Sequence, residues 1–318
     1  NRFALDFDVT WATRRTAYNT DFSAYVVRPS PTIREQFGFG LEMALFVFDY
    51  PTLQARTFQG INQVIQESPL DGRVEPSTYF LVSRADDAVT WTMDYLSRNP
   101  QVRNPIPIPI SRLTTVATPD ALRAMFAEHV YRRDLFDYRQ PLILDTYFFG
   151  REALVSKLRD NIKNNQNSGL FGLRKTGKTS LLFKLLREAK GNKFAKIFYF
   201  DCQSPSIRQR RSIDLIDYIN KQLIEQSQIS SKSFDKLSPY DAFPKIVKTL
   251  SKAAPVCLIF DEIEYISPFA KTDDHWRREF VDLWQLIRSV QSSGEGLSFI
   301  IGGVNASVCE APVFDGIH

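Results

Sequence analysis

The sequence predicts two α/β domains, one after the other along the chain. Its 318 residues exceed what one hydrophobic core usually organises. Short apolar runs alternate with stretches of helical periodicity from about residue 42 onward, a pattern that favours parallel strands joined by right-handed crossovers. We expect a small Rossmann-like α/β domain over residues 1–135, a linker over 136–147 with the boundary near Pro141, and a second α/β domain over 148–318.

Two βα units are predicted in the first domain, whose first 40 residues show no clear pattern. Residues 43–48 (MALFVF) predict a buried strand, and Pro51 is expected at the start of the following helix. Residues 78–83 (TYFLVS) predict a second strand, followed by a helix that Asp86 or Asp87 caps. The inward positions are expected to be Leu53, Phe58, Ile61, Val64 and Ile65 in the first unit and Val89, Met93 and Leu96 in the second.

A third strand over residues 106–110 is interrupted by Pro107 and Pro109. Proline cannot donate to a ladder of hydrogen bonds, so this segment is expected at the edge of the sheet. Thr118 is expected to cap the next helix, with Pro119 at its first position.

The second domain repeats the alternation of strands and helices. A helix follows the segment FFGRE at 148–152, with Leu154, Val155, Leu158 and Ile162 on one face. Strands are expected at 169–171, 196–201, 256–260 and 298–302, and further helices at 213–224, 241–252 and 274–290.

Residues 172–179 (GLRKTGKT) fit the GxxxxGK[ST] spacing of a phosphate-binding P-loop. Its glycines let the loop curl so that successive backbone N–H groups face the phosphates, and the next helix offers its positive N-terminus. Lys178 is placed for the β- and γ-phosphates and Thr179 for Mg²⁺. The residues expected to bind nucleotide are Gly172, Leu173, Arg174, Lys175, Thr176, Gly177, Lys178, Thr179 and Ser180. The predicted cofactors are ATP and Mg²⁺.

Downstream, VCLIFDEIE at 256–264 is an apolar strand that ends in two acids. Asp261 is placed to hold the hydration shell of Mg²⁺, and Glu262 to polarise the attacking water. A solvated acid at a strand end is the alternative, but the P-loop upstream favours the catalytic interpretation.

After the last predicted strand, GGVNAS offers Asn305 as a polar sensor of the γ-phosphate, with Ser307 as a lesser candidate. A turn asparagine after two glycines explains Asn305 equally well.

Composition argues against a membrane protein and leaves nucleic-acid binding open. No apolar run approaches the length of a membrane span. A net charge of +4 permits weak attraction to nucleic acid but falls short of a basic nucleic-acid-binding surface, so the charge does not decide between partners. Cys202, Cys257 and Cys309 are too widely spaced for a disulfide framework, so we expect buried thiols and a cytoplasmic location. His129 and His275 have no neighbouring acid or cysteine at metal-binding spacing.

One acid in the first domain remains ambiguous. Asp49 follows the strand 43–48, at the kind of strand end where α/β sheets bind ligands. A helix-capping role before Pro51 explains it as well.

The P-loop and its neighbours resemble the additional-strand class of P-loop ATPases and, within it, the AAA+ and STAND families. The archaeal-type, origin-recognition-like branch, with P-loops of the form GxRRxGKTSLL, is the most similar. The matching positions are Gly172, Arg174, Lys175, Gly177, Lys178, Thr179, Ser180, Leu181 and Leu182, with Lys175 in place of the second arginine. FFGRE is similar to a segment of these families that lies near the base, which implies nucleotide contacts for Gly150 and Arg151.

The resemblance covers roughly residues 145–310 and leaves the first domain unassigned. It implies a sheet ordered 5-1-4-3-2 and a helical lid with a second sensor arginine. Strands 1 to 4 can be placed in the sequence, whereas strand 5 and the lid cannot, so we expect the ATPase domain to be incomplete at its C-terminal side.

Two sets of cations permit a functional or an ordinary interpretation. Arg277 and Arg278 are candidates for an arginine finger in a homo-oligomer, although a solvated helix face is the more usual explanation. The cluster Arg208, Arg210, Arg211, Lys190, Lys193 and Lys196 permits contact with a nucleic-acid backbone or is ordinary surface charge.

Three functions fit these features. The favoured one is a slow regulatory ATPase of the STAND type, whose nucleotide state controls oligomerisation and an N-terminal effector or sensor domain; the resemblance suggests prokaryotic antiviral defence or signalling. The second is a DNA-binding AAA+ ATPase that resembles origin-recognition and loading proteins. In the third, the first domain is itself an enzyme, such as a nuclease, and the ATPase is its gate.

Overall fold

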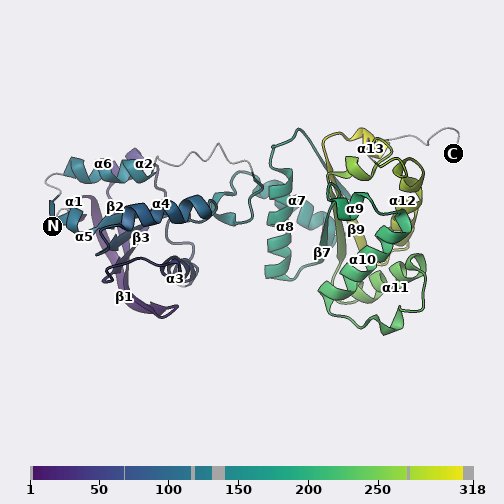
Figure 1. Ribbon diagram of the computed structural model, residues 1–318, viewed down its shortest axis with the longest axis horizontal. Coiled ribbons are helices and arrows are strands. Elements are labelled where there is room, and N and C mark those ends of the chain that lie inside the picture. Colours follow the sequence, from purple (N-terminus) through teal and green to yellow (C-terminus); the bar gives the residue numbers. More distant parts are fainter. Residues whose placement is uncertain (1–2, 68, 116–118, 131–139, 271–272, 311–318) are drawn as a thin grey trace. The chain divides into compact units, whose positions relative to one another are not determined.

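The computed structural model describes residues 3–67, 69–115, 119–130, 140–270 and 273–310. The chain divides into two compact units, Asn1–Gln140 and Pro141–His318 (Figure 1). Thr118 and residues 136–139 of the expected linker lie outside the described residues.

The first unit is a mixed five-stranded sheet with the strands in sequence order. The strands are β1 (Phe7–Ala17), β2 (Thr20–Pro29), β3 (Met43–Phe48), β4 (Thr78–Ser83) and β5 (Asn104–Pro109). Its helices are α1 (Phe3–Asp6), α2 (Pro31–Phe37), α3 (Ala55–Ile65), α4 (Ala88–Arg98), α5 (Ile110–Thr115) and α6 (Pro119–Val130). β1 to β3 pair antiparallel, and β3 to β5 pair parallel. The predicted α/β class is confirmed, and the sheet also contains a hairpin that the sequence pattern did not reveal.

That hairpin joins β1 and β2 through Tyr18 and Asn19, which both have positive φ, at 51° and 55°. Two left-handed residues in succession form the type I′ turn whose twist suits adjoining strands. β1 is exposed at most of its positions, so its sequence lacks the clean alternation of apolar and polar residues that identifies a half-buried strand.

Helices cover both faces of this sheet and form two separate cores. On one face, α3 and α4 pack against β2, β3 and β4 around Phe46, Phe58 and Leu81. On the other face, residues of α2 and α6 surround Phe80, Ile106 and Phe126. Asp6 is buried beneath α6, where it accepts a hydrogen bond from Arg123 at 2.7 Å.

Two local predictions for this unit are wrong. Pro51 does not begin α3, which starts at Ala55 with Gln54 as its N-cap. On α4, Val89 is only partly buried, whereas Ala88 and Thr92 are buried. Trp91 and Tyr95 stack on Phe58, at 5.1 and 4.2 Å between ring centroids, because large planar side chains cover more of the neighbouring helix than the aliphatic face does.

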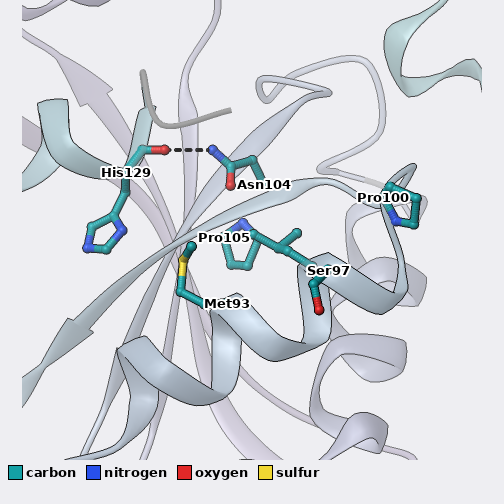
Figure 2. A pocket seen from close by; sticks show the side chains of 7 residues that line it. Met93, Ser97, Pro100, Asn104, Pro105 and His129 are labelled. Atoms are coloured by element: carbon teal, nitrogen blue, oxygen red, sulfur yellow. Dashed lines mark hydrogen bonds between the residues drawn. The ribbon is translucent and has the colours of Figure 1, made fainter. Parts of the chain in front are cut away.

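The displaced aliphatic side chains of α4, Met93 and Leu96, line a small cavity of about 220 Å³ beside β5 (Figure 2). There the Asn104 amide donates to the backbone oxygen of His129 at 3.0 Å, which joins β5 to the end of α6. The cavity is smaller than most ligand sites, which occupy about 300–1,000 Å³.

β5 is an edge strand, as its prolines predict. The Asn104 N–H donates to Ser77 at 2.7 Å, toward β4. Because N–H directions alternate along a strand, Pro105, Pro107 and Pro109 place their missing donors on the open side.

The order of strands also bears on Asp49. Ligands bind α/β sheets where the strand order reverses, and this sheet runs β1 to β5 without a reversal. Asp49 is exposed and pairs with Arg84 at 2.9 Å.

The second unit is a parallel four-stranded sheet in the order β6-β9-β8-β7. The strands are β6 (Ser168–Phe171), β7 (Lys196–Asp201), β8 (Val256–Asp261) and β9 (Leu297–Gly303). The helices are α7 (Glu152–Lys163), α8 (Lys178–Asn192), α9 (Pro205–Arg208), α10 (Ser212–Ser227), α11 (Pro239–Ser251), α12 (Trp276–Ser292) and α13 (Ser307–Glu310), with 3₁₀ turns η1 (Asp145–Tyr147), η2 (Ser231–Ser233) and η3 (Ile263–Ile266). If the four strands of this unit are numbered 1 to 4 along the chain, their order in the sheet is 1-4-3-2. This order agrees with the predicted 5-1-4-3-2 sheet, and the described residues contain no fifth strand.

Each face of this sheet has its own core. α7 and α8 pack on one face around Leu158, Leu181 and Ile259. On the other, α10, α11 and α12 pack around Ile216, Phe260 and Trp284. Burial raises the pKa of the thiols of Cys202 and Cys257, which are both free. The side chain of Cys309 lies outside the part of the chain that the structure describes.

None of the described helices is both long enough and apolar enough to span a bilayer.

Candidate functional site

The turn between β6 and α8 has the backbone that a phosphate-binding loop needs. Gly177 and Lys175 have φ values of 82° and 62°, in the left-handed region where glycine is favoured. The Gly172 N–H donates to the oxygen of Gly303 at 3.2 Å, which fastens the start of the loop to the end of β9. The Thr176 hydroxyl donates to Leu173 O at 2.8 Å and closes the turn from within.

Lys178 is the first residue of α8, and only 6% of its surface is exposed. Its Nζ donates to the backbone oxygens of Gly172 and Leu173 at 2.8 and 3.0 Å. A buried ammonium group needs acceptors to offset its lost hydration. The loop supplies these, and they hold the charge within the turn.

Thr179 and Asp261 meet at the C-terminal end of the sheet. The Thr179 hydroxyl donates to Asp261 Oδ2 at 2.7 Å, and the Tyr199 hydroxyl donates to the same oxygen at 3.0 Å. Asp261 ends β8 and is 1% exposed. Burial, with a further contribution from the charge of Asp261, raises the pKa of Tyr199, so its hydroxyl stays a donor. Tyr199 belongs to β7 and was not among the predicted site residues.

Asp261 fits this position because residue 302 has no side chain. A Cβ on Gly302 would lie 2.6 Å from Asp261 Oδ1 and 3.5 Å from its Cα. Asp261 Oδ1 accepts a hydrogen bond from the N–H of Glu262 at 3.0 Å. The glycine of β9 therefore permits the close approach of the neighbouring strand.

Glu262 follows Asp261 in a left-handed conformation with φ of 53°. This conformation is rare for a residue with a side chain, and such strain concentrates at functional sites. Burial raises the pKa of Glu262, and the negative charges of Asp261 and Glu264 raise it further, against the lowering effects of Lys178 and Arg174. The carboxylate of Glu262 is thus a stronger base than an ordinary glutamate.

Glu264 is a second residue that the sequence analysis missed. Its Oε1 accepts the N–H groups of Val304 and Asn305, the latter at 3.1 Å. A Cβ on Gly303 would lie 2.6 Å from the same oxygen. The acid at 264 looks like a solvated residue in the sequence, and only the position of β9 beside β8 reveals its partners.

The segment before α7 lies against the P-loop helix. We call residues 141–147 the leading segment. The Ser180 hydroxyl, predicted to bind nucleotide, accepts the Leu142 N–H at 2.9 Å. Asp145 pairs with Lys184 at 2.9 Å and with Arg187 at 2.5 Å.

The other predicted nucleotide contacts lie around the same turn. Gly150 has φ of 77°, and Arg151 Nη1 lies 3.7 Å from the position of a Cβ on Gly177. Arg174 donates to the Tyr265 hydroxyl at 3.5 Å, at the limit of a hydrogen bond. Leu173 is 75% exposed at the surface of the loop.

Asn305 is exposed, and its side-chain oxygen accepts the Ser307 N–H at 3.0 Å at the start of α13. This contact is typical of an asparagine in a turn, the alternative to a sensor of the γ-phosphate. The sensor function remains a prediction.

Several of the arginines singled out in the sequence have partners within the unit. Arg208 pairs with Asp273 at 2.5 Å, and Arg211 pairs with Glu279. Arg210 lies over the Tyr218 ring, 4.6 Å from its centroid. Arg277 pairs with Asp274 at 3.6 Å. The pairs of Arg208 and Arg211 fasten α9 and the start of α10 to the region where α12 begins.

The residues present fit a nucleotide with Mg²⁺. Thr179 and Asp261 bring a hydroxyl and a carboxylate to within 2.7 Å of each other. Magnesium in phosphate-transfer sites takes oxygen ligands of this kind, with water and phosphate oxygens completing its shell. The described residues hold no cluster of three or more histidine, cysteine or acidic side chains suited to a metal on its own.

Fold and site together define a P-loop nucleotide-binding domain. Residues 164–311 match a family model described as an AAA domain. The second unit is therefore similar to P-loop domains of the AAA class over these residues.

Among solved structures, one described as a DNA replication initiation factor is similar at 16% identity with a TM-score of 0.28. The match covers 52% of this chain and 46% of that chain, so the chain spans less than half of that protein. No curated protein matches the chain.

Proposed function

We propose that this protein is an ATP-binding and ATP-hydrolysing switch of the STAND or AAA+ type. In this proposal the nucleotide state of the second unit controls self-association and the activity of the N-terminal unit. The observation that carries it is the convergence of Lys178, Thr179 and Asp261, with Glu262 adjacent, at one end of the parallel sheet.

Each residue has a task that follows from its contacts. Lys178 exchanges the two carbonyls of its own loop for phosphate oxygens and so keeps charge-assisted hydrogen bonds. Thr179 and Asp261 would hold Mg²⁺, which would supply charge stabilisation to the phosphate oxygens. Glu262 accepts the proton of the attacking water, and its raised pKa makes it a stronger base than an ordinary glutamate. Water forms a bond to the γ-phosphorus, the bond to the β-phosphate oxygen breaks, and ADP and phosphate leave.

The leading segment supports the switch part of the proposal. Ser180 directly follows Thr179 and holds the Leu142 N–H, while Asp145 is paired with two cations of α8. A movement of the first turn of α8 on nucleotide binding therefore pulls on the chain that leads from the N-terminal unit. The proposal includes the role in prokaryotic antiviral defence or signalling that the resemblance suggests.

ATP turnover by the full chain tests the enzymatic part. Lys178→Ala removes charge-assisted hydrogen bonds of about 1.5–3 kcal/mol, so the dissociation constant for ATP should rise roughly 10- to 100-fold. Lys190→Ala, an exposed lysine of the same helix, is the matched control. Equal affinity in the two variants would show that the turn does not hold the triphosphate.

Self-association tests the regulatory part. Gel filtration of the full chain with a non-hydrolysable ATP analogue should reveal a larger species than with ADP. An unchanged monomer would remove oligomerisation from the proposal while leaving ATP hydrolysis intact.

The alternative is a DNA-binding AAA+ ATPase. Salt-sensitive binding of duplex DNA, together with DNA-stimulated turnover, would favour it. The ion pairs of Arg208 and Arg211 within the unit weigh against a phosphate-binding role for that cluster.

A further inference from the structure

Glu264 joins two loops at the end of the ATPase sheet. It lies in η3, just after β8, and its Oε1 accepts the N–H groups of Val304 and Asn305, which follow β9. One carboxylate oxygen therefore holds two successive peptide N–H groups, those of Val304 and Asn305.

The contact is built into β9 as well. A Cβ on Gly303 would lie 2.6 Å from Glu264 Oε1 and 3.0 Å from its Cδ, so only glycine leaves room for the carboxylate. The oxygen of Gly303 in turn accepts the N–H of Gly172, the first residue of the P-loop, at 3.2 Å. A continuous set of contacts thus runs from Glu264 through residues 303–305 to the phosphate-binding turn.

The carboxylate also carries a cost in stability. Oε2 of Glu264 is buried and has no hydrogen-bond partner among the described residues, and an unpartnered buried acceptor is costly. Asp261 and Glu262 lie close by and carry the same charge, which adds to that cost.

We propose that Glu264 is a positioning residue for ATP hydrolysis, which holds the loop 303–305 against the start of the P-loop. The inference rests on the proposed ATPase function. It predicts that Glu264 acts on turnover and on the order of that loop, and has little effect on nucleotide affinity.

Amide hydrogen exchange of the full chain tests the structural half without any turnover. The Val304 and Asn305 amides should be protected in the parent and should exchange at least about 10-fold faster in Glu264→Ala, because their acceptor is gone. Asp282→Ala, an exposed acid on α12, is the control and should leave these amides unchanged.

Kinetics tests the catalytic half. Glu264→Ala should lower kcat about 10- to 100-fold, the cost of a small misplacement, while the dissociation constant of a fluorescent ATP analogue changes less than about 3-fold. Glu264→Gln keeps an accepting oxygen for both N–H groups and should recover most of kcat. Gly303→Ala should resemble Glu264→Ala, and the double variant should be no slower than either, because removing the carboxylate relieves the clash.

The outcomes separate the two proposals. If the parent hydrolyses no ATP, the proposed function fails and the positioning role fails with it. If the parent turns over and Glu264→Ala is equally fast, or if its loop amides stay protected, only the role of Glu264 is overturned.

Discussion

The Thr179 hydroxyl lies 2.7 Å from Asp261 Oδ2, although 82 residues separate the two in the chain. Both lie at the C-terminal end of the parallel sheet. Thr179 belongs to the helix after β6, and Asp261 is the last residue of β8. A hydroxyl and a carboxylate at this separation could supply two of the six oxygen ligands that Mg²⁺ takes. The proposed reaction depends on these two side chains keeping this relative position.

Gly302→Ala tests how tightly Asp261 is held. The new Cβ would lie 2.6 Å from Asp261 Oδ1, so the carboxylate must leave its present position beside Thr179. We expect Mg²⁺-dependent ATP binding to weaken by roughly 10-fold, equal to about 1.4 kcal/mol, as measured by calorimetry at several Mg²⁺ concentrations.

A glycine of α8 supplies the control for that substitution. Gly191 has open space where a Cβ would be added, so Gly191→Ala should stabilise the helix by about 0.5–1 kcal/mol without altering ATP binding. Unchanged Mg²⁺ dependence in Gly302→Ala would mean that Asp261 does not serve the metal.

Glu262→Gln tests the proposed base through its pKa. Burial and the neighbouring acids raise the pKa of Glu262, so the acid limb of the kcat profile should lie above the range of an ordinary glutamate. The variant should bind ATP but turn over at least about 100-fold more slowly, since general base catalysis contributes 10²–10⁴-fold. A variant that keeps most of its turnover would assign the base elsewhere.

The same shift has a consequence for stability. A carboxyl group whose pKa is higher in the folded state binds its proton more tightly there, so the free energy of unfolding falls as pH rises from the ordinary pKa to the raised one. Glu262→Gln removes this loss. Its Tm should exceed that of the parent near neutral pH, and the difference should disappear in acid below the ordinary pKa of glutamate.

Much of the ATPase fold could be predicted because its strands are short continuous apolar runs. VCLIF at 256–260 gave β8, and the P-loop spacing located the start of α8 at Lys178. The meeting of Thr179 and Asp261 was expected because the P-loop spacing and the acid at the strand end both pointed to the same Mg²⁺. Tyr199 and Glu264 could not be predicted in the same way, because their contacts depend on which strand lies beside β8 and on the glycines of β9.

The N-terminal unit shows a different limit. β3 and β4 matched their predicted bounds, whereas β1 and β2 were missed because most of β1 is exposed and mixes threonine, arginine and aromatic residues. On α4, periodicity pointed to Met93, but stacking of Trp91 and Tyr95 on Phe58 decided the buried face. Periodicity identifies an apolar face of a helix, but the neighbouring helix determines which face is buried.

Ser180→Ala distinguishes two roles for a residue in the P-loop set. The sequence places Ser180 among the nucleotide contacts, whereas its hydroxyl accepts the Leu142 N–H at 2.9 Å. We expect the variant to lose about 1 kcal/mol of stability and to keep ATP affinity within roughly 2-fold, or about 0.4 kcal/mol. Chemical denaturation and ATP titration measure the two, and a large loss of affinity would restore the nucleotide-binding role.

Pro107→Val tests the idea that prolines close the β5 edge of the first unit. Pro107 is buried, and its missing donor faces the open side of the sheet. Valine suits a strand and returns an N–H to that edge, so the fold should persist with a loss of about 0.4–1 kcal/mol from the more flexible unfolded chain. Because open edges pair with other chains, light scattering at a fixed protein concentration should show faster self-association than in the parent.

The other edge strand of that sheet, β1, is also protected, and a proline outside the strands provides the control for Pro107→Val. β1 is interrupted by a bulge between Val9 and Trp11 and carries the exposed Arg14 and Arg15, devices that also discourage edge pairing. Pro100→Ala, at an exposed position outside the strands, should lose comparable stability and gain no tendency to associate. Equal scattering from Pro107→Val and Pro100→Ala would show that β5 is protected by something other than its prolines.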